Sequence, residues 1–233
     1  MSLPSDILLE LFGHREYRGS QQEIIERVLS GGHSLIIMPT GMGKSLCYQL
    51  PAVVLADRAR SGEQQAEPPL RSVTAPLTLV ISPLIALMQD QVDGLRLNGV
   101  PAAASHSNLD ANGRRQLNQL IESGELRILF VAPERLFRAD FLEWLTQQDV
   151  SAIAIDEAHC ISQWGHDFRP EYRRISELRD LFPGVPLHAY TATATPRVRD
   201  DIREQLQLKD AVELVGTFDR PELTYRVLPR QSL

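Results

Sequence analysis

Six short apolar segments with strand-forming composition recur along the chain, and stretches with helical patterning separate them. Several are apolar throughout rather than alternating, as is typical of strands buried on both faces. This alternation favours an α/β fold with a mostly parallel sheet and helices on both sides. The expected strands are Leu35–Met38, Leu77–Ser82, Arg127–Ala132, Ala152–Asp156, Leu187–Thr191 and Val212–Val215, and the expected helices are Gln22–Leu29, Lys44–Ala56, Leu84–Leu97, Ala111–Ser123, Glu171–Leu181 and Arg197–Leu206.

One segment interrupts this pattern. Asp57–Pro76 is polar, contains proline and has almost no apolar periodicity, which predicts a flexible surface insertion. An insertion without a function of its own is favoured over a binding element.

Composition narrows the class of protein. The 233 residues, 43% of them hydrophobic, suffice for one large domain or two small ones. No apolar run approaches the roughly 18–20 residues that span a bilayer, and the first ten residues lack the features of a signal peptide. Cys47 and Cys160 lie far apart without metal-ligand spacing, so we expect a reduced, cytoplasmic protein. The net charge of −6 implies that any nucleic acid would have to bind in a local groove.

The segment Met38–Ser45, MPTGMGKS, lies between an expected strand and an expected helix. A phosphate-binding loop (P-loop) needs glycines so that backbone N–H groups can close around phosphates. It also needs a lysine for the β- and γ-phosphates and a hydroxyl for Mg²⁺. Met38 stands where the general pattern has its first glycine. A plain glycine-rich turn is the weaker alternative, and the residues expected to bind ATP are Thr40, Gly41, Met42, Gly43, Lys44 and Ser45.

A second motif, Ala154–His159 (AIDEAH), follows an apolar strand. We expect Asp156 to hold Mg²⁺ together with Ser45, and Glu157 to orient or deprotonate the attacking water. An acidic pair alone is usually a solvated strand end. Beside a P-loop it predicts an ATPase in which Lys44, Asp156 and Glu157 are catalytic.

Longer strings make the resemblance specific. The chain resembles superfamily 2 helicases, and within them the RecQ family of DNA helicases, at residues 12–21 (FGHREYRGSQ), 82–91 (SPLIALMQDQ), 132–136 (APERL), 156–170 (DEAHCISQWGHDFRP), 191–195 (TATAT) and 218–221 (FDRP). The resemblance implies a RecA-like P-loop NTPase domain over residues 1–217. Residues 218–233 would then begin a linker to a second RecA-like lobe that this sequence does not contain.

The resemblance also implies roles for residues around the ATP site. Arg18 would stack on adenine and Gln21 would pair with its edge, whereas His14 stands where the family has a tyrosine. Thr191 and Thr193 would hydrogen-bond the DEAH segment through His159, although simple strand-end capping by threonine is an alternative.

Residues 158–170 resemble the aromatic-rich loop that couples single-stranded DNA to the ATP site in this family. Bases would stack on Trp164 and Phe168, and Arg169 would contact a phosphate or an aromatic ring. Burial of both aromatic residues in the core is the alternative. The remaining residues that the resemblance assigns to DNA binding or coupling are His166, Ser82 and Arg135.

The resemblance therefore implies the nucleotide-binding lobe of an ATP-dependent 3′→5′ DNA helicase, with ATP and Mg²⁺ as cofactors and single-stranded and duplex DNA as partners. A stand-alone nucleotide-dependent binding module and an RNA helicase are the alternatives. The oligomeric state stays open.

Overall fold

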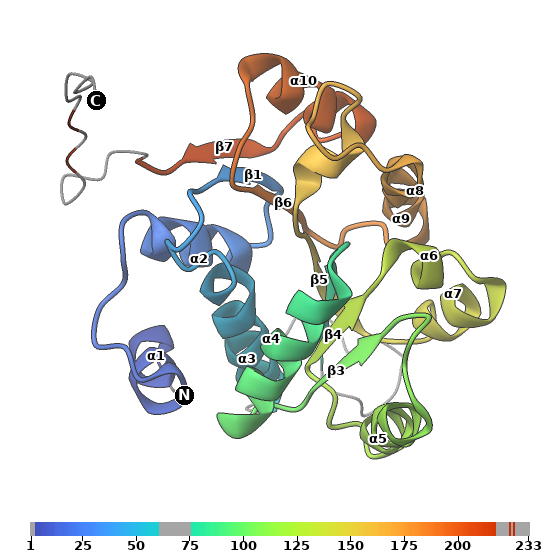
Figure 1. Cartoon of the computed structure of the whole chain (residues 1–233). Helices are drawn as coiled ribbons and strands as arrows, with labels where there is room; N and C mark the ends of the chain where they lie inside the picture. Colours follow the sequence, from blue (N-terminus) through green and yellow to red (C-terminus); the bar gives the residue numbers. More distant parts are fainter. Residues whose placement is uncertain (1–2, 61–75, 218–223, 225, 227–233) are drawn as a thin grey trace, which may run out of the picture.

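The protein is described by a computed structural model that covers residues 3–60, 76–217, 224 and 226. Within these residues seven strands form one sheet: β1 Ser34–Ile37, β2 Leu77–Ile81, β3 Ala102–Ser105, β4 Ile128–Val131, β5 Val150–Ile155, β6 Leu187–Thr191 and β7 Val212–Val215. They lie in the order β3-β4-β2-β5-β6-β1-β7, and every neighbouring pair runs parallel (Figure 1). The expected parallel α/β sheet is confirmed.

Helices cover both faces of the sheet. They are α1 Pro4–Phe12, α2 Gln21–Leu29, α3 Leu46–Arg60, α4 Ile85–Leu97, α5 Ala111–Glu122, α6 Pro133–Leu136, α7 Ala139–Leu145, α8 Pro170–Arg173, α9 Leu178–Leu181 and α10 Pro196–Gln205, with short 3₁₀ helices η1 Ala158–Ile161 and η2 Arg174–Glu177. In Figure 1 the helices α1 to α4 lie on one side of the sheet and α5 to α10 on the other. No described helix combines the length and hydrophobicity that crossing a bilayer requires.

The two helical layers produce two cores, because successive residues of a strand point to opposite faces. On β1, Leu35 and Ile37 enter the core beneath α5 to α10, whereas Ile36 enters the core beneath α2, α3 and α4. Burial on both sides explains why the strand segments are apolar throughout. The helix α1 completes the layer formed by α2, α3 and α4, and its Ile7 and Leu8 pack on α3.

Several element boundaries differ from expectation. The strand β3 was missed because three of its four residues are alanine, which has a weak strand preference. The expected helix Glu171–Leu181 is divided into α8, η2 and α9. The helix α3 continues to Arg60, since arginines in its last turn favour the negative end of the helix dipole. The first four residues of the predicted insertion are therefore helical, while residues 61–75 and the string at 218–221 lie outside the described residues.

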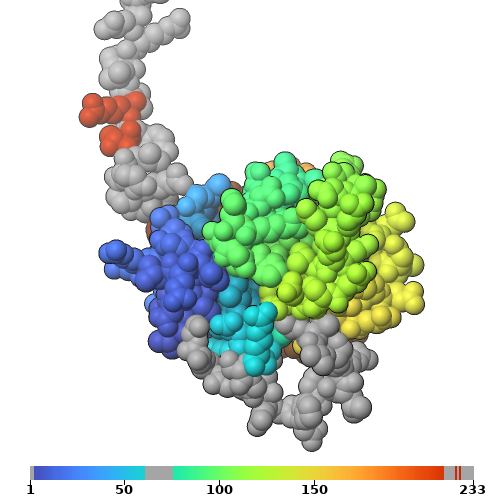
Figure 2. Space-filling model, turned by 90° about the horizontal axis from the view of Figure 1, so that it is seen from below, coloured from blue at the N-terminus to red at the C-terminus, as the bar shows by residue number. Residues whose placement is uncertain are grey.

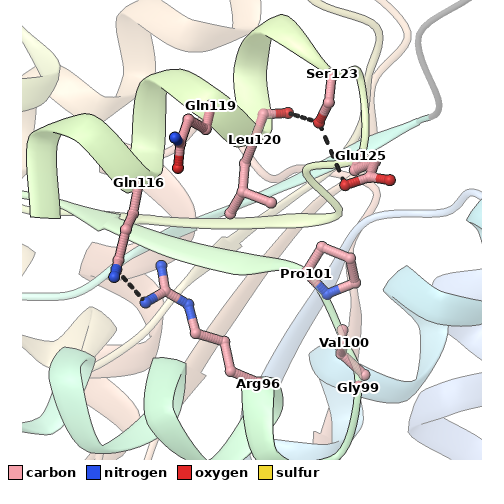
Figure 3. Close-up of a pocket in the computed structure, with 9 residues that line it drawn as sticks. All are labelled: Arg96, Gly99, Val100, Pro101, Gln116, Gln119, Leu120, Ser123 and Glu125. Carbon is pink, nitrogen blue, oxygen red and sulfur yellow. Dashed lines mark hydrogen bonds between the residues drawn. The ribbon is translucent and has the colours of Figure 1, made fainter.

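The edge strand β3 is covered by a contact between two helices. Arg96 of α4 donates from Nε to the carbonyl of Ala102 at 2.8 Å and from Nη1 to Oε1 of Gln116 on α5 at 2.8 Å. In Figure 2 the surfaces of α4 and α5 border each other on one face of the molecule. Between them lies a surface cavity of about 560 Å³, lined in part by Pro101 and Leu120 (Figure 3). Because Pro101 precedes β3, the cavity lies at the amino ends of the strands, away from the P-loop.

Candidate functional site

The expected catalytic residues lie at the carboxyl ends of parallel strands, along one edge of the sheet. The P-loop follows β1, Ser82 follows β2, Asp156 follows β5 and Thr191 ends β6. Because β6 lies between β1 and β5, one strand separates the P-loop from the acidic pair. Open parallel sheets bind their ligands at this edge.

The P-loop turns from β1 into α3 and uses glycine where the backbone enters the left-handed region. The φ angle is 85° at Gly41 and 75° at Gly43, values that strain a residue with a side chain. Lys44 Nζ donates to the carbonyl of Met38 at 3.1 Å, so the ammonium group is held against the start of the loop. Ser45 directly precedes α3, whose first N–H groups and positive dipole end favour an anion.

Gln21 joins the segment before α2 to the P-loop. Its buried side chain accepts a hydrogen bond from the backbone N–H of Arg18 at 2.8 Å. Its amide nitrogen donates to the carbonyls of Met42 and Gly43 at 3.1 and 3.2 Å. Both amide hydrogens are thus used within the protein, while the amide oxygen, which accepts from Arg18, keeps a second lone pair. The expected pairing of this amide with the adenine edge stays a prediction. The side chains of Arg18 and His14 are exposed.

The adjacent carboxyl groups of Asp156 and Glu157 have different environments. Asp156 is 6% exposed, and its burial, together with the charge of Glu157, raises its pKa to about 6 against the opposing effects of Lys44 and the Ser82 hydroxyl. Glu157 accepts a hydrogen bond from His159 at 3.2 Å, and this bond lowers its pKa. Glu157 is therefore ionised near neutral pH, as a general base must be.

The backbone at Glu157 is strained. Its φ of 49° and ψ of 45° lie in the left-handed helical region, which costs a residue with a Cβ atom about 1–2 kcal/mol. Such strain is concentrated at functional positions, where surrounding contacts hold it in place. Here the next residues form η1, which is buried against the end of β6 and α10.

His159 connects Glu157 to the end of β6. Its Nδ1 lies 3.2 Å from Oε2 of Glu157 and 3.0 Å from Oγ1 of Thr191. The Thr191 hydroxyl donates to the carbonyl of Thr193 at 3.1 Å, so its oxygen accepts from His159 and Nδ1 carries the hydrogen. The expected bond between Thr191 and the DEAH segment is present. The alternative strand-end cap is present too, because the N–H of Thr193 donates to the same oxygen at 3.3 Å.

The loop after η1 places an aromatic residue at the surface. Trp164 is 58% exposed, which removes the alternative of a core residue, and Phe168 is half-buried with the Arg173 guanidinium 5.2 Å from its ring centre. The ring of His166 stacks on that of His159, with centres 4.1 Å apart and planes at 19°. The loop is therefore in direct contact with the residue that holds Glu157.

Arg169 ties the same loop to the segment after β2. It donates to the carbonyl of Pro83 at 3.3 Å and pairs with Asp167 at 3.1 Å. The neighbouring Ser82 is 2% exposed and its hydroxyl lies close enough to Asp156 to lower the pKa of that carboxyl group. Ser82 therefore belongs to the surroundings of Asp156. Its expected contact with a DNA backbone stays a prediction.

Arg135, the other expected DNA contact, lies on α6 away from the acidic pair. It forms an ion pair with Asp140 at 3.0 Å and its guanidinium lies 5.1 Å from the ring centre of Phe141. With 26% of its side chain exposed, Arg135 is held by these contacts and keeps part of its surface open to solvent.

Buried tyrosines support the site and were missed from the sequence. Tyr172 donates from its hydroxyl to the carbonyl of Asp156 at 3.1 Å, and Tyr190 donates to the carbonyl of Cys47 on α3 at 3.3 Å. The ring of Tyr48 packs edge-on against Tyr190, with centres 5.4 Å apart. Nothing in a single sequence distinguishes such tyrosines from ordinary core residues.

Comparison with known proteins agrees with this geometry. The family model described as DEAD/DEAH box helicase matches residues 18–202. The chain belongs to this family. The ATP-dependent DNA helicase RecQ of Pasteurella multocida is 42% identical over 97% of the chain, and that of Haemophilus influenzae is 42% identical over 94%. The expected resemblance to RecQ helicases is confirmed.

The chain spans about a third of these relatives, namely 33% and 32% of their lengths. A solved structure described as DUF1998 helicase MrfA bound to DNA superposes with a TM-score of 0.65 at 19% identity, over 93% of this chain and 30% of that one. At this identity the likeness concerns the fold alone, and it confirms the expected RecA-like α/β fold.

Proposed function

We propose that this chain is the nucleotide-binding lobe of an ATP-dependent 3′→5′ DNA helicase, which couples ATP hydrolysis to movement along single-stranded DNA and to duplex unwinding. One observation carries the proposal. Glu157 of the ATP site is bonded to His159, and His159 in turn bonds Thr191 at the end of β6 and stacks on His166 of the loop that carries Trp164. Contact with DNA can therefore reach the hydrolytic residues through very few side chains.

Lys44 and Ser45 would bind the phosphates of ATP together with the backbone N–H groups of residues 40–45. Glu157 is ionised, and its carboxylate is oriented by His159, so it would orient the attacking water and take up its proton. The exposed guanidinium of Arg18 would stack on the adenine. Gln21 would then act on the nucleotide through the loop to which its amide is bonded.

The residues present fit a magnesium ion. Asp156 is a buried carboxyl group whose proton affinity is raised by its surroundings, as expected of an oxygen ligand placed for a cation. Ser45 adds a hydroxyl oxygen, and Mg²⁺ prefers such oxygen ligands in combination with water and substrate phosphates. When bound, the ion would neutralise charge on the phosphate oxygens. Within the described residues no three His, Cys, Asp or Glu side chains form a metal cluster.

For DNA, the proposal assigns Trp164 and Phe168 to base stacking and Arg169 to a backbone contact. Stacking on an exposed indole is insensitive to sequence, which suits a motor that moves along any strand. Arg135 would contribute its remaining exposed surface to the same strand. A second RecA-like lobe would close the ATP site from the other side and supply transition-state arginines.

The test is ATP hydrolysis and strand separation by the protein that carries this chain, with Lys44→Ala compared with Lys209→Ala. These are the two lysines of the sequence, and Lys209 is exposed in the turn before β7. We expect Lys44→Ala to abolish DNA-stimulated hydrolysis and unwinding while Lys209→Ala retains both. Nucleotide binding without DNA-stimulated hydrolysis in the unaltered protein would instead support a binding module, and stimulation by RNA alone would contradict a DNA motor.

A further inference from the structure

The exposed indole of Trp164 is not free to rotate, because one of its faces is covered. The guanidinium carbon of Arg197 lies 3.3 Å from the centre of the Trp164 ring, which is the distance of a stacked cation. With 58% of Trp164 still exposed, the opposite face of the ring is open to solvent. Arg197 comes from α10, more than thirty residues further along the chain.

The position of Arg197 on α10 is fixed by its neighbours. Thr195 caps the helix by accepting a hydrogen bond from the N–H of Val198 at 3.4 Å, and Pro196 opens the first turn. Arg197 therefore occupies the second helical position, where a positive charge opposes the helix dipole. Helix stability does not explain an arginine at this position, whereas its contact with the indole does.

The backbone beneath Trp164 is fixed as well. The N–H of Trp164 donates to the Ser162 hydroxyl at 3.1 Å, and the N–H of Gly165 donates to the Ser162 carbonyl at 3.0 Å. A Cβ atom at Gly165 would lie 2.4 Å from the carbonyl oxygen of His159, so the turn packs directly on η1. The backbone does not determine the orientation of the indole ring, and the contact with Arg197 does.

The β6–α10 segment, residues 191–197 from the last residue of β6 to the first turn of α10, thus contacts residues 158–170 at two points. At its start the Thr191 hydroxyl bonds His159, which holds Glu157. At its end Arg197 stacks on Trp164. Displacement of the ring by a base would therefore act on the same short segment that positions the hydrolytic carboxylate.

From these contacts we infer that Arg197 is a positioning residue for DNA recognition: its guanidinium holds the Trp164 indole so that the outer face of the ring receives a nucleobase, and it links that ring to the β6–α10 segment. The inference rests on the proposed function, because it presupposes that Trp164 stacks on DNA. It assigns to Arg197 no direct contact with DNA.

The first measurement needs no DNA. In a Trp144→Phe background Trp164 is the remaining tryptophan of the chain, and its fluorescence anisotropy decay reports local motion of the ring. We expect Arg197→Ala to increase the amplitude of nanosecond motion, with Lys209→Ala, which also removes one exposed positive charge, leaving it unchanged. Unchanged ring motion in Arg197→Ala would overturn the contact.

The second measurement is binding of a thymidine oligonucleotide at low salt. We expect Arg197→Ala to weaken binding roughly 2- to 5-fold, the range of an exposed cation–π contact. In a Trp164→Ala background the same substitution should have no further effect. Tighter binding by Arg197→Ala would show that the guanidinium blocks the base, and an equal loss in the Trp164→Ala background would show a direct phosphate contact. Either result would overturn the inference.

The two measurements separate the inference from the proposed function. If the unaltered chain fails to bind the oligonucleotide, the proposed DNA contact fails, while the anisotropy decay still decides whether Arg197 holds the ring. If the unaltered chain binds and Arg197→Ala changes neither measurement, the inference alone fails.

Discussion

Oγ1 of Thr191, the last residue of β6, lies 3.0 Å from Nδ1 of His159, and the same nitrogen lies 3.2 Å from the carboxylate of Glu157. The hydroxyl can only accept from this nitrogen, because its own hydrogen is donated to the Thr193 carbonyl. His159 is thereby held in one tautomer and in one orientation. A displacement of the β6 end would therefore reach Glu157 through one imidazole ring.

Thr191→Val tests this connection with little change in side-chain volume. We expect a loss of about 1 kcal/mol in stability, the usual value of one hydrogen bond, and a roughly 5- to 10-fold lower DNA-stimulated rate of ATP hydrolysis. Thr146→Val is the matched control, since the Thr146 hydroxyl donates to the Glu143 carbonyl on α7 at 2.9 Å. Equal effects of the two substitutions on the stimulated rate would contradict a special role for Thr191.

Trp164→Ala should separate hydrolysis from its dependence on DNA. Stacking of a base on an aromatic side chain contributes about 1–3 kcal/mol, so the single-stranded DNA concentration for half-maximal ATPase stimulation should rise roughly 5- to 150-fold. Trp144→Phe, at a half-buried position packed on Phe141, is the control and should leave that concentration unchanged. The measurement is ATPase rate against DNA concentration. A half-maximal concentration unaffected by Trp164→Ala would show that the ring is not a DNA contact.

The parallel sheet was predictable because its signal is local. Strands such as β2 and β4 are short apolar runs, and their composition alone marks them as buried on both faces. The strand β3 could not be found in this way, because three of its residues, Ala102, Ala103 and Ala104, are alanines, and alanine favours a helix. Its strand conformation depends on parallel pairing with β4 and on cover from α4 and α5, which only the assembled fold provides.

The site shows the same division. Lys44, Asp156 and Glu157 follow strands in recognisable motifs, and a parallel sheet brings such segments to one edge. The burial of Ser82 and the internal bonding of Gln21 depend on side-chain packing across the fold, and motif spacing gives no information about it. The stack of Arg197 on Trp164 joins two segments that no pattern in the sequence connects.

Backbone strain at Glu157 can be measured by comparing Glu157→Gly with Glu157→Ala. Both remove the carboxylate and its bond to His159, so they differ mainly in the cost of the left-handed conformation, φ 49°. The glycine variant avoids that strain, but its unfolded chain has more conformational freedom. The net effect should leave the glycine variant about 0.5–1 kcal/mol more stable than the alanine variant. Urea denaturation of the two variants is the measurement. An alanine variant as stable as the glycine variant would show that the position carries no strain.

Stability should depend on pH through His188, which is 1% exposed and bonded to Ser34 at 2.7 Å. Burial, with the nearby His33 and Arg27, lowers its pKa from 6.5 to about 3. Between these two pH values the unfolded chain binds a proton at this histidine that the folded chain excludes. The contribution of neutral His188 to stability is therefore complete above pH 6.5, and it falls with decreasing pH by up to about 1.4 kcal/mol per pH unit.

Asp156 has the opposite effect on the pH dependence of stability, because its folded pKa of about 6 lies above its ordinary value and the folded chain binds its proton more readily. Comparison of the unaltered chain with His188→Gln isolates the histidine. We expect denaturant midpoints of the variant to fall less steeply between pH 7 and pH 5. Parallel pH dependences would show that His188 is protonated as readily in the folded chain as in the unfolded one.

The contact of Arg96 with the edge strand β3 predicts that its loss would promote aggregation. Arg96 bonds the side chain of Gln116 (Figure 3) and also the carbonyl of Ala102, so Arg96→Ala removes the cover from an edge strand. We expect a loss of about 1–2 kcal/mol in urea denaturation and increased light scattering at high protein concentration, since uncovered edges pair with other chains. Gln116→Ala removes one bond and leaves the carbonyl of Ala102 covered. It should lose some stability and stay monodisperse. Equal scattering from both variants would mean that Arg96 does not protect this edge.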